Sequence, residues 1–389
     1  MKTNELIVTN FAYGTGPYLR TTELAIAFNA ELEQRGHERL RVIIPWVYGE
    51  KQRSIMLEEF AEHDVKYPGE LLLDEKLGSL LKEIFYGDNT YEEALSKWVA
   101  NHDKLSDRIR EHLQGKIHVE TLGGKKSVVD GQNIVLELNR SPRVLYGVAP
   151  TCSSTFGHIA EVLDTLREVD VADVAVDREL AKAGSDLADK IERAQNIHTI
   201  AYPATFSGMK DYTPRYPNSH LVPPITSLPH GDIGGDLDDG IFVTITGIPG
   251  LERLYEEARV LGLKLYSNDT DAVPGSEKQL PHIIPNNAIQ FQFARAGWGS
   301  VWLSMFSGTP IVVPDFDPND DPEIYFNNRM VEELGIGIIY RGQPLSEILA
   351  ERGRVQANCK AMREKIIERW GVLEGNSISA KLFSDHFLQ

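Results

Sequence analysis

The chain has 389 residues, 42% of them hydrophobic and 25% charged, a composition typical of a globular protein with two domains of ordinary size. Its 57 acidic and 40 basic residues give a formal net charge of −17, which argues against binding to a nucleic-acid backbone but allows a small anionic ligand at a local basic patch. The polar N-terminus, the lack of a long apolar run and two unclustered cysteines (Cys152 and Cys359) predict a cytoplasmic protein with no transmembrane segment and free thiols.

The first residues alternate between strand and helix patterns. Residues 5–10 (ELIVTN) predict a strand, residues 21–37 an amphipathic helix that ends at a glycine, and residues 41–47 (RVIIPWV) a second strand. This order predicts a βαβ unit and therefore a parallel sheet. Residues 71–85 and 90–113 are predicted to form two helices.

The next segment carries turn signals between runs of β-prone residues. Residues 118–138 contain Gly-Gly and Asp-Gly and predict antiparallel strands or a hairpin. Residues 143–150 (RVLYGVAP) predict a buried strand, followed by a polar loop at 151–158 (TCSSTFGH) and a helix at 159–169. Residues 198–204 (HTIAYPA) predict the last strand of this half.

A segment dense in Pro, Gly and Asp, residues 213–240, has the composition of a linker. The alternation then restarts and ends in a long helical tail. We therefore expect an α/β protein of two Rossmann-like βα domains that face each other across a cleft, with the ligand at the carboxyl ends of the strands. The expected boundaries are a first Rossmann-like domain at 1–220, a linker at 221–240, a second Rossmann-like domain at 241–370, and a final helix at 371–389 that could pack back on the first domain.

One turn in the second half has the composition of an anion site. In ARAGWGS, Gly297, Gly299 and Ser300 place backbone N–H groups at the start of a helix, where the helix dipole favours negative charge. Arg295 precedes them and could make a charge-assisted contact with a diphosphate oxygen. The alternative is a tight strand-to-helix turn without a ligand.

The surrounding motifs resemble the nucleotide-sugar core of GT-B glycosyltransferases. Both the plant-type UDP-glycosyltransferases and the enzyme that adds N-acetylglucosamine to the lipid-linked peptidoglycan precursor run a glycine turn and helix into a Gly-x-Pro strand, a loop, and an Asn-containing helix. Here these parts are ARAGWGS, SGTPIVVP, DFDPNDDPEIYFNN and MVEELGIG, in that order. The upstream HIIPNN resembles the loop that reads the nucleobase, and GTGPYLR resembles the N-terminal glycine-rich loop. The likeness covers the whole architecture and is specific over residues 282–337.

The resemblance implies a set of residues that bind the donor. The groups that would hold the diphosphate belong to Arg295, Gly297, Trp298, Gly299 and Ser300. Ile283 and Ile284 would line the base pocket, and Glu323 and Asn327 would contact the sugar. Gly14 and Gly16 would form the N-terminal loop. Alternatively, the two isoleucines are ordinary strand residues and Glu323 is a solvated residue of an acidic loop.

Two positions depart from the family pattern. Leu303 stands where these enzymes carry the acid that binds the ribose, so that contact is lost, moved, or made by Ser304 or a backbone group. The N-terminal loop lacks the histidine that many relatives carry near Tyr18. An inverting transfer needs a general base, and the candidates are His158, ranked first, Tyr18 and Glu23. His158 could instead be a helix-start histidine with a structural hydrogen bond, and Glu23 a surface acid near a helix N-terminus. An unperturbed tyrosine is a poor base without help.

We therefore expect a glycosyltransferase of the hexosyltransferase type, moving a sugar from a nucleoside diphosphate sugar, UDP-sugar foremost, to a hydroxyl acceptor by inversion. We expect no metal and no cofactor, with the acidic loop at 315–321 solvated or facing the substrate. The alternatives are a GT-B-fold epimerase and a non-catalytic nucleotide-sugar-binding partner subunit. Four aromatic residues could line the acceptor pocket or belong to the core: Trp46, Tyr48, Phe85 and Tyr86. The acceptor, the sugar and the oligomeric state stay open.

Overall fold

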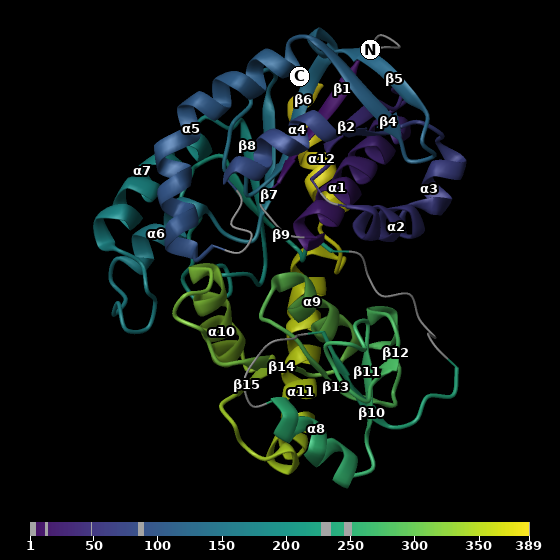
Figure 1. Cartoon of the computed structure of the whole chain (residues 1–389), viewed down its shortest axis with the longest axis vertical. Helices are drawn as coiled ribbons and strands as arrows, with labels where there is room; N and C mark the ends of the chain where they lie inside the picture. The colour runs from purple at the N-terminus through teal and green to yellow at the C-terminus, as the bar shows by residue number, and fades with distance from the viewer. Residues whose placement is uncertain are drawn as a thin grey trace. The chain divides into compact units, whose positions relative to one another are not determined.

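The computed structural model describes residues 5–11, 15–47, 49–84, 89–226, 235–244 and 251–388 (Figure 1). The chain folds into two compact units. Unit 1 comprises residues 1–201, 213–225 and 375–389, and unit 2 comprises residues 202–212 and 226–374.

Unit 1 is built on a sheet to which the described residues contribute nine strands in the order β5-β4-β3-β2-β1-β6-β7-β8-β9. All neighbouring pairs are parallel except β3–β4 and β4–β5, which are antiparallel. The strands are β1 Leu6–Phe11, β2 Arg41–Pro45, β3 Leu71–Asp74, β4 Lys116–Thr121, β5 Lys126–Asp130, β6 Ile134–Arg140, β7 Thr151–Thr155, β8 Ile197–Ala201 and β9 Ser219–Val222.

Helices cover both faces of this sheet, with α5, α6 and α7 on one side and α1 and α12 on the other (Figure 1). The C-terminal helix α12 packs on α1, where the rings of Phe28 and Phe387 lie 5.8 Å apart. The helices of unit 1 are α1 Thr15–Gln34, α2 Glu50–Glu59, α3 Ala61–Lys66, α4 Glu75–Leu81, α5 Tyr91–Leu113, α6 Ile159–Leu166, α7 Arg178–Arg193 and α12 Asn376–Phe387, with short 3-10 turns at Lys82–Ile84 and Gly131–Asn133.

Two local predictions for unit 1 were wrong. Leu71–Asp74 is a strand rather than the start of a helix, because its four residues are buried between β2 and β4 and Asp74 then caps α4 by accepting from the Leu77 N–H at 2.9 Å. Residues 143–150 are not a strand; the sheet instead takes β6 before them and β7, the predicted polar loop, after them. The residues of β7 are all buried in the sheet between β6 and β8, so polarity alone misplaced this segment. The predicted hairpin exists as β4–β5.

Unit 2 is built on a parallel sheet whose six described strands run in the order β12-β11-β10-β13-β14-β15. One face packs on α8 and α11, and the other packs on the turn at Pro281–Ile283 and on α9. The elements are β10 Gly240–Val243, β11 Lys264–Ser267, β12 Glu277–Lys278, β13 Ile289–Phe293, β14 Ile311–Pro314, β15 Gly337–Tyr340, α8 Leu251–Val260, α9 Trp298–Ser307, α10 Pro322–Leu334 and α11 Leu345–Trp370. The predicted α/β class is confirmed.

The segment between β8 and β9 belongs to unit 2, although the sequence placed it in the first domain. Within residues 202–212, the carbonyl of Pro203 accepts from Trp302 Nε1 at 2.8 Å, and Phe206 packs on Phe326 with ring centroids 5.1 Å apart. Strand β9 reaches Val222 inside the sheet of unit 1, so residues 221–222 of the expected linker are part of that sheet. Tertiary contacts, rather than composition, set these borders.

Candidate functional site

The turn from Arg295 to Ser300 connects β13 to α9 at a special point of the unit 2 sheet. Strand order reverses between β10 and β13, because the chain adds β11 and β12 on one side and β13 to β15 on the other. Parallel sheets bind ligands outside the carboxyl ends of the strands at such a reversal. The turn follows the carboxyl end of β13 and therefore lies at this position.

The start of α9 leaves two backbone donors open. Gly297 N–H donates to the Arg295 carbonyl at 2.7 Å, and Ser300 N–H donates to the Gly297 carbonyl at 3.0 Å. No side chain caps the helix, and in the described part of the chain no acceptor meets the N–H of Trp298 or Gly299. Since the helix dipole adds positive potential here, an anionic oxygen is the natural partner of both groups.

Both glycines of the turn face open space. A Cβ built on Gly297 or on Gly299 would meet no heavy atom within 4 Å, and neither residue has a positive φ. Packing and backbone conformation therefore do not require glycine at either place. A ligand that approaches the backbone closely would require it.

Arg295 stands at the rim of the turn with 43% of its side chain exposed. Its guanidinium forms an ion pair with Asp320 in the loop before α10. Burial raises the pKa of Asp320 although Arg295 opposes that shift. The turn thus carries an accessible cation that is already partly neutralised.

Trp298 and Asn327 support the turn from inside. Trp298 is 1% exposed, and its Nε1 donates to Asn327 Oδ1 at 2.7 Å and to Thr205 Oγ1 at 3.2 Å. Asn327, fully buried, donates in turn to the Ala296 carbonyl at 2.9 Å and to Glu323 Oε1 at 3.2 Å. The side chains of both residues were expected to contact the donor and instead point into unit 2, whereas Glu323 is half-buried at the start of α10.

The predicted base pocket is part of the core. Ile283 and Ile284 are 0% and 1% exposed and pack with Phe242 and Tyr266. Their N–H groups donate to the carbonyls of Leu280 and Pro281 at 3.2 and 3.1 Å. Neither the side chains nor these donors are free for a nucleobase, so the structure favours the alternative that the two isoleucines are structural residues of the core.

The side chain of Ser304, one expected replacement for the ribose contact, is buried in α9. Leu303 packs against the same core cluster as Ile283. Ser304 is fully buried, and its Oγ has no hydrogen-bond partner. Neither residue can reach a ribose from these positions.

Tyr18 and Glu23, two of the base candidates, lie on α1 in unit 1. Tyr18 is 1% exposed, and its hydroxyl donates to Met56 Sδ at 2.7 Å while its ring packs on Trp46, which is 7% exposed. Both aromatics are therefore core residues. Glu23 pairs with Arg20 through Oε1, and its Oε2 is buried with no hydrogen-bond partner in the described part of the chain.

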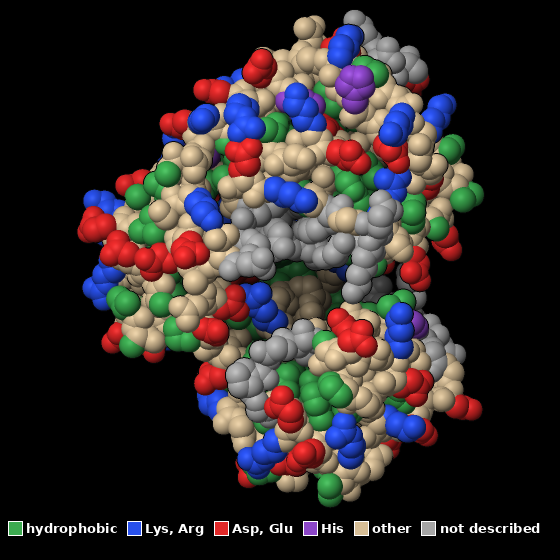
Figure 2. All heavy atoms as spheres, in the orientation of Figure 1, with side chains coloured by type: hydrophobic (Ala, Val, Ile, Leu, Met, Phe, Trp, Pro, Cys, Tyr) green, Lys and Arg blue, Asp and Glu red, His purple; other side chains and the backbone are tan. Residues whose placement is uncertain are grey.

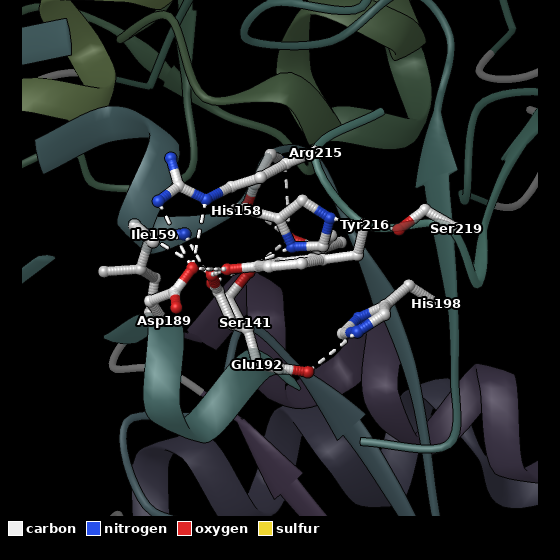
Figure 3. Close-up of polar contacts among 12 residues, drawn as sticks. Ser141, His158, Ile159, Asp189, Glu192, His198, Arg215, Tyr216 and Ser219 are labelled. Carbon is white, nitrogen blue, oxygen red and sulfur yellow. Dashed lines mark hydrogen bonds and ion pairs between the residues drawn. The ribbon is translucent and has the colours of Figure 1, made fainter. Parts of the chain in front are cut away.

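His158, ranked first as the base, lies inside a polar network of unit 1 (Figure 3). It is 1% exposed and lies between His198 and Tyr216, with its ring centroid 4.8 and 4.6 Å from theirs. Burial, together with His198 and Arg215, holds the pKa of His158 well below its usual range. A side chain enclosed in this way cannot take a proton from a bound acceptor, so the placement argues against the predicted role.

Glu192 organises this network. Its carboxylate accepts from the Ile159 N–H at 2.6 Å, at the start of α6, and from the Tyr216 hydroxyl at 2.9 Å. Its backbone carbonyl lies 2.9 Å from His198 Nε2 (Figure 3). Burial raises the pKa of Glu192 to about 7 and lowers that of His198 to about 4. The network ties α6, α7, β8 and β9 together and is structural.

Comparison with solved structures decides the architecture. No family model and no curated protein matches the sequence. TcCGT1 in complex with UDP aligns over 100% of this chain and 99% of its own, with a TM-score of 0.63 and 11% identity. A UDP-glucosyltransferase from Polygonum tinctorium, in complex with 3,4-dichloroaniline, aligns over 100% and 99% with a TM-score of 0.61 and 11% identity. Arabidopsis thaliana UGT89C1 complexed with UDP-L-rhamnose aligns over 100% of this chain and 99% of its own, with a TM-score of 0.57 and 14% identity.

The chain has the GT-B fold. The resemblance predicted from ARAGWGS and the motifs after it is confirmed at the level of the fold. At 11–14% identity these matches do not carry over the role of any single residue.

Sequence analysis missed two asparagines at the corresponding point of unit 1. In its sheet the order reverses between β1 and β6, and Asn10 and Asn139 are register partners near the carboxyl ends of these strands. Both are fully buried, and within the described ranges neither amide atom of Asn139 has a hydrogen-bond partner, nor does Asn10 Oδ1. The signal in the sequence was that both strands, LIVTNF and IVLELNR, carry an asparagine near the end.

Gly14, Tyr48, Phe85 and Tyr86 lie outside the described residues, and Gly16 lies in the first turn of α1.

Over the described ranges, no helix is long and apolar enough to cross a membrane, and no group of three His, Cys, Asp or Glu side chains could hold a metal ion. Acidic and basic side chains are interspersed on the face drawn in Figure 2.

Proposed function

We propose that this chain is a glycosyltransferase that takes a hexose from a nucleoside diphosphate sugar, with UDP as the nucleotide, and transfers it to a hydroxyl acceptor. The observation that carries the proposal is the turn at 295–300, which combines two open N–H groups, two glycines facing open space and an exposed arginine. Solved structures with this fold were obtained with UDP and with UDP-L-rhamnose.

The chemistry follows from charge. As the sugar–oxygen bond breaks, negative charge grows on the leaving diphosphate, and the N–H groups of Trp298 and Gly299 together with Arg295 would stabilise it. We propose that these groups allow transfer without a metal and that the acceptor attacks the opposite face of the sugar, with inversion. That attack needs a base to remove the acceptor proton.

Glu23 is the base candidate that the geometry leaves. Tyr18 and His158 are each 1% exposed in the core of unit 1, whereas the side chain of Glu23 is 10% exposed, and its buried Oε2 has no hydrogen-bond partner among the described residues. We propose that this oxygen accepts the proton of the acceptor hydroxyl. Glu23→Gln keeps the shape of the side chain and should abolish transfer while UDP affinity stays unchanged.

The first test is calorimetric binding of UDP, GDP and dTDP, and then of their sugars. We expect micromolar binding of UDP, and no binding of any of the three would refute the proposal. Transfer is then measured as UDP release from UDP-glucose with quercetin and 3,4-dichloroaniline, the small molecules bound in two of the solved structures with this fold.

A second candidate is a nucleotide-sugar binder without turnover. The enclosure of Tyr18 and His158 favours it, because a chain that has no working base can still bind the donor. It predicts that UDP-sugar binds but that no UDP is released, with or without an acceptor. Slow hydrolysis of UDP-glucose that is lost in Arg295→Ala would exclude this candidate.

A further inference from the structure

Asn327 is placed where it can control the shape of the turn. It lies on α10, yet its side chain contacts both sides of the α9 start, through the Ala296 carbonyl before the helix and the Trp298 indole within it. Both bonds are short, 2.9 and 2.7 Å, and Asn327 is fully buried. A buried amide that bridges two points of a turn holds their separation fixed.

Those two points flank the proposed diphosphate contacts. Arg295 and Gly297 neighbour Ala296, and the open N–H groups belong to Trp298 and Gly299. Among the described residues the turn has few other side-chain restraints: a Cβ on either glycine would meet nothing within 4 Å, and no side chain caps the helix. The orientation of the two N–H groups therefore depends on the bridge.

Thr205 holds the same indole from another part of unit 2. Its hydroxyl oxygen lies 3.2 Å from Trp298 Nε1, longer than the bond to Asn327. Only Asn327 also reaches the Ala296 carbonyl, so the two partners are not equivalent. Losing Asn327 removes a hydrogen bond on each side of the turn, to the Ala296 carbonyl and to the Trp298 indole. Losing Thr205 removes only a second bond to the same indole.

We propose that Asn327 is a positioning residue, which fixes the two N–H groups toward a diphosphate without contacting the donor. This inference rests on the proposed function and replaces the role first expected for Asn327, that of a sugar contact. Binding sites lose affinity steeply when supporting residues let them shift by a fraction of an ångström. Substitution of Asn327 should therefore weaken UDP binding more than the accompanying loss of folding stability accounts for.

The neighbouring Asn328 provides a matched control. It is also buried, at 7% exposure, and donates from Nδ2 to a backbone carbonyl at 2.9 Å, but this carbonyl belongs to Pro314 at the end of β14. Asn327→Asp and Asn328→Asp each replace a buried amide donor with a carboxylate, and Asn327→Asp also removes the longer bond to Glu323 Oε1. Each should lower the melting temperature, so stability alone cannot separate them.

The experiment measures the Kd for UDP by titration calorimetry, at a temperature where circular dichroism shows every variant folded. We expect Asn327→Asp to weaken UDP about tenfold or more, because hydrogen bonds to a charged ligand depend on alignment, and Asn328→Asp to change it less than about threefold. Trp298→Phe removes the indole N–H together with part of the buried ring, and should weaken UDP in the same direction, with less than additive loss in the double variant. It also covers the case in which Asn327→Asp fails to fold.

The outcomes separate this inference from the proposed function. If the unaltered protein binds UDP but Asn327→Asp and Trp298→Phe leave Kd within twofold, the positioning role is wrong and the proposed function stands. Equal weakening in Asn327→Asp and Asn328→Asp also overturns the positioning role, since it would reflect general destabilisation. If the unaltered protein binds no UDP, both fall.

Discussion

Arg295 and Asp320 form an ion pair beside the turn that we propose as the diphosphate site. The pair joins the end of β13 to the loop before α10, and 43% of the arginine side chain and 30% of the aspartate side chain remain exposed. Exposed pairs of this kind add little to stability. Their effect on an incoming anion is larger, because the arginine attracts it and the aspartate repels it.

Arg295→Ala is expected to weaken UDP binding by about tenfold to a hundredfold, the range for losing a hydrogen bond between charged groups. Titration calorimetry at low and high salt measures it, and the difference from the unaltered protein should shrink as salt rises. Arg341→Ala, which breaks an exposed pair with Glu332 elsewhere in unit 2, is the control. Equal losses in both variants would mean that net charge, rather than a contact, matters.

Asp320→Asn is expected to act in the opposite direction. It removes the negative charge that competes for Arg295, so UDP should bind about twofold to tenfold more tightly at low salt. The melting temperature should change little, as for other exposed pairs. Weaker UDP binding in this variant would show that Asp320 holds Arg295 in its binding position.

Gly299→Ala should separate stability from binding. Alanine in a helix is more stable than glycine by about 0.5–1 kcal/mol, and here the added methyl group meets nothing within 4 Å. The melting temperature should therefore rise while UDP affinity falls, because the methyl group occupies the path of the diphosphate. Gly353→Ala, in α11 and equally unobstructed, should raise the melting temperature without changing Kd. Unchanged UDP binding in Gly299→Ala would contradict close approach at this glycine.

Asn139→Leu should stabilise the ligand-free protein. The buried amide of Asn139 makes no hydrogen bond to any described residue. Replacing it with an apolar group of similar shape removes a desolvation penalty of about 1 kcal/mol or more, which corresponds to about 2 °C in melting temperature. Asn29 is the matched control: it is equally buried but bonds Leu40 through both amide atoms, at 2.7 and 2.9 Å. Asn29→Leu should lower the melting temperature. A decrease of the same size for Asn139→Leu would show that an ordered water satisfies its amide.

The pH dependence of stability should reveal Glu192. A carboxyl group whose pKa rises from 4.5 to about 7 on folding binds its proton more tightly in the folded state. The stability that this proton adds to the folded state is complete below about pH 4.5 and is lost as pH rises toward 7. Glu192→Gln cannot lose this contribution. Its melting temperature, relative to the unaltered protein, should therefore rise between pH 5 and pH 8. The exposed Glu179→Gln on the same helix controls for net charge, and an opposite trend in Glu192→Gln would mean that the folded state favours the ionised carboxylate.

Local patterns in the sequence determined the α/β class, most helices of the second half and the position of the turn at 295–300. These features depend on residues close together in the chain: apolar spacing, turn glycines and the order of strand and helix. The same local logic misassigned Leu71–Asp74, because a short apolar run suits a buried strand as well as a helix. Composition likewise misplaced residues 202–212.

Only the tertiary structure decided what each candidate side chain does. Trp298 meets Asn327 across 29 positions of sequence, and His158 meets Ser219 across 61. No local pattern records such contacts, or the burial that turns Ile283 and Ile284 into core residues. The sequence by itself determined where backbone donors could collect at a helix start, because glycine and turn chemistry are local. Which side chains hold that start and which can reach a ligand depends on packing between distant segments, so only the folded chain could decide it.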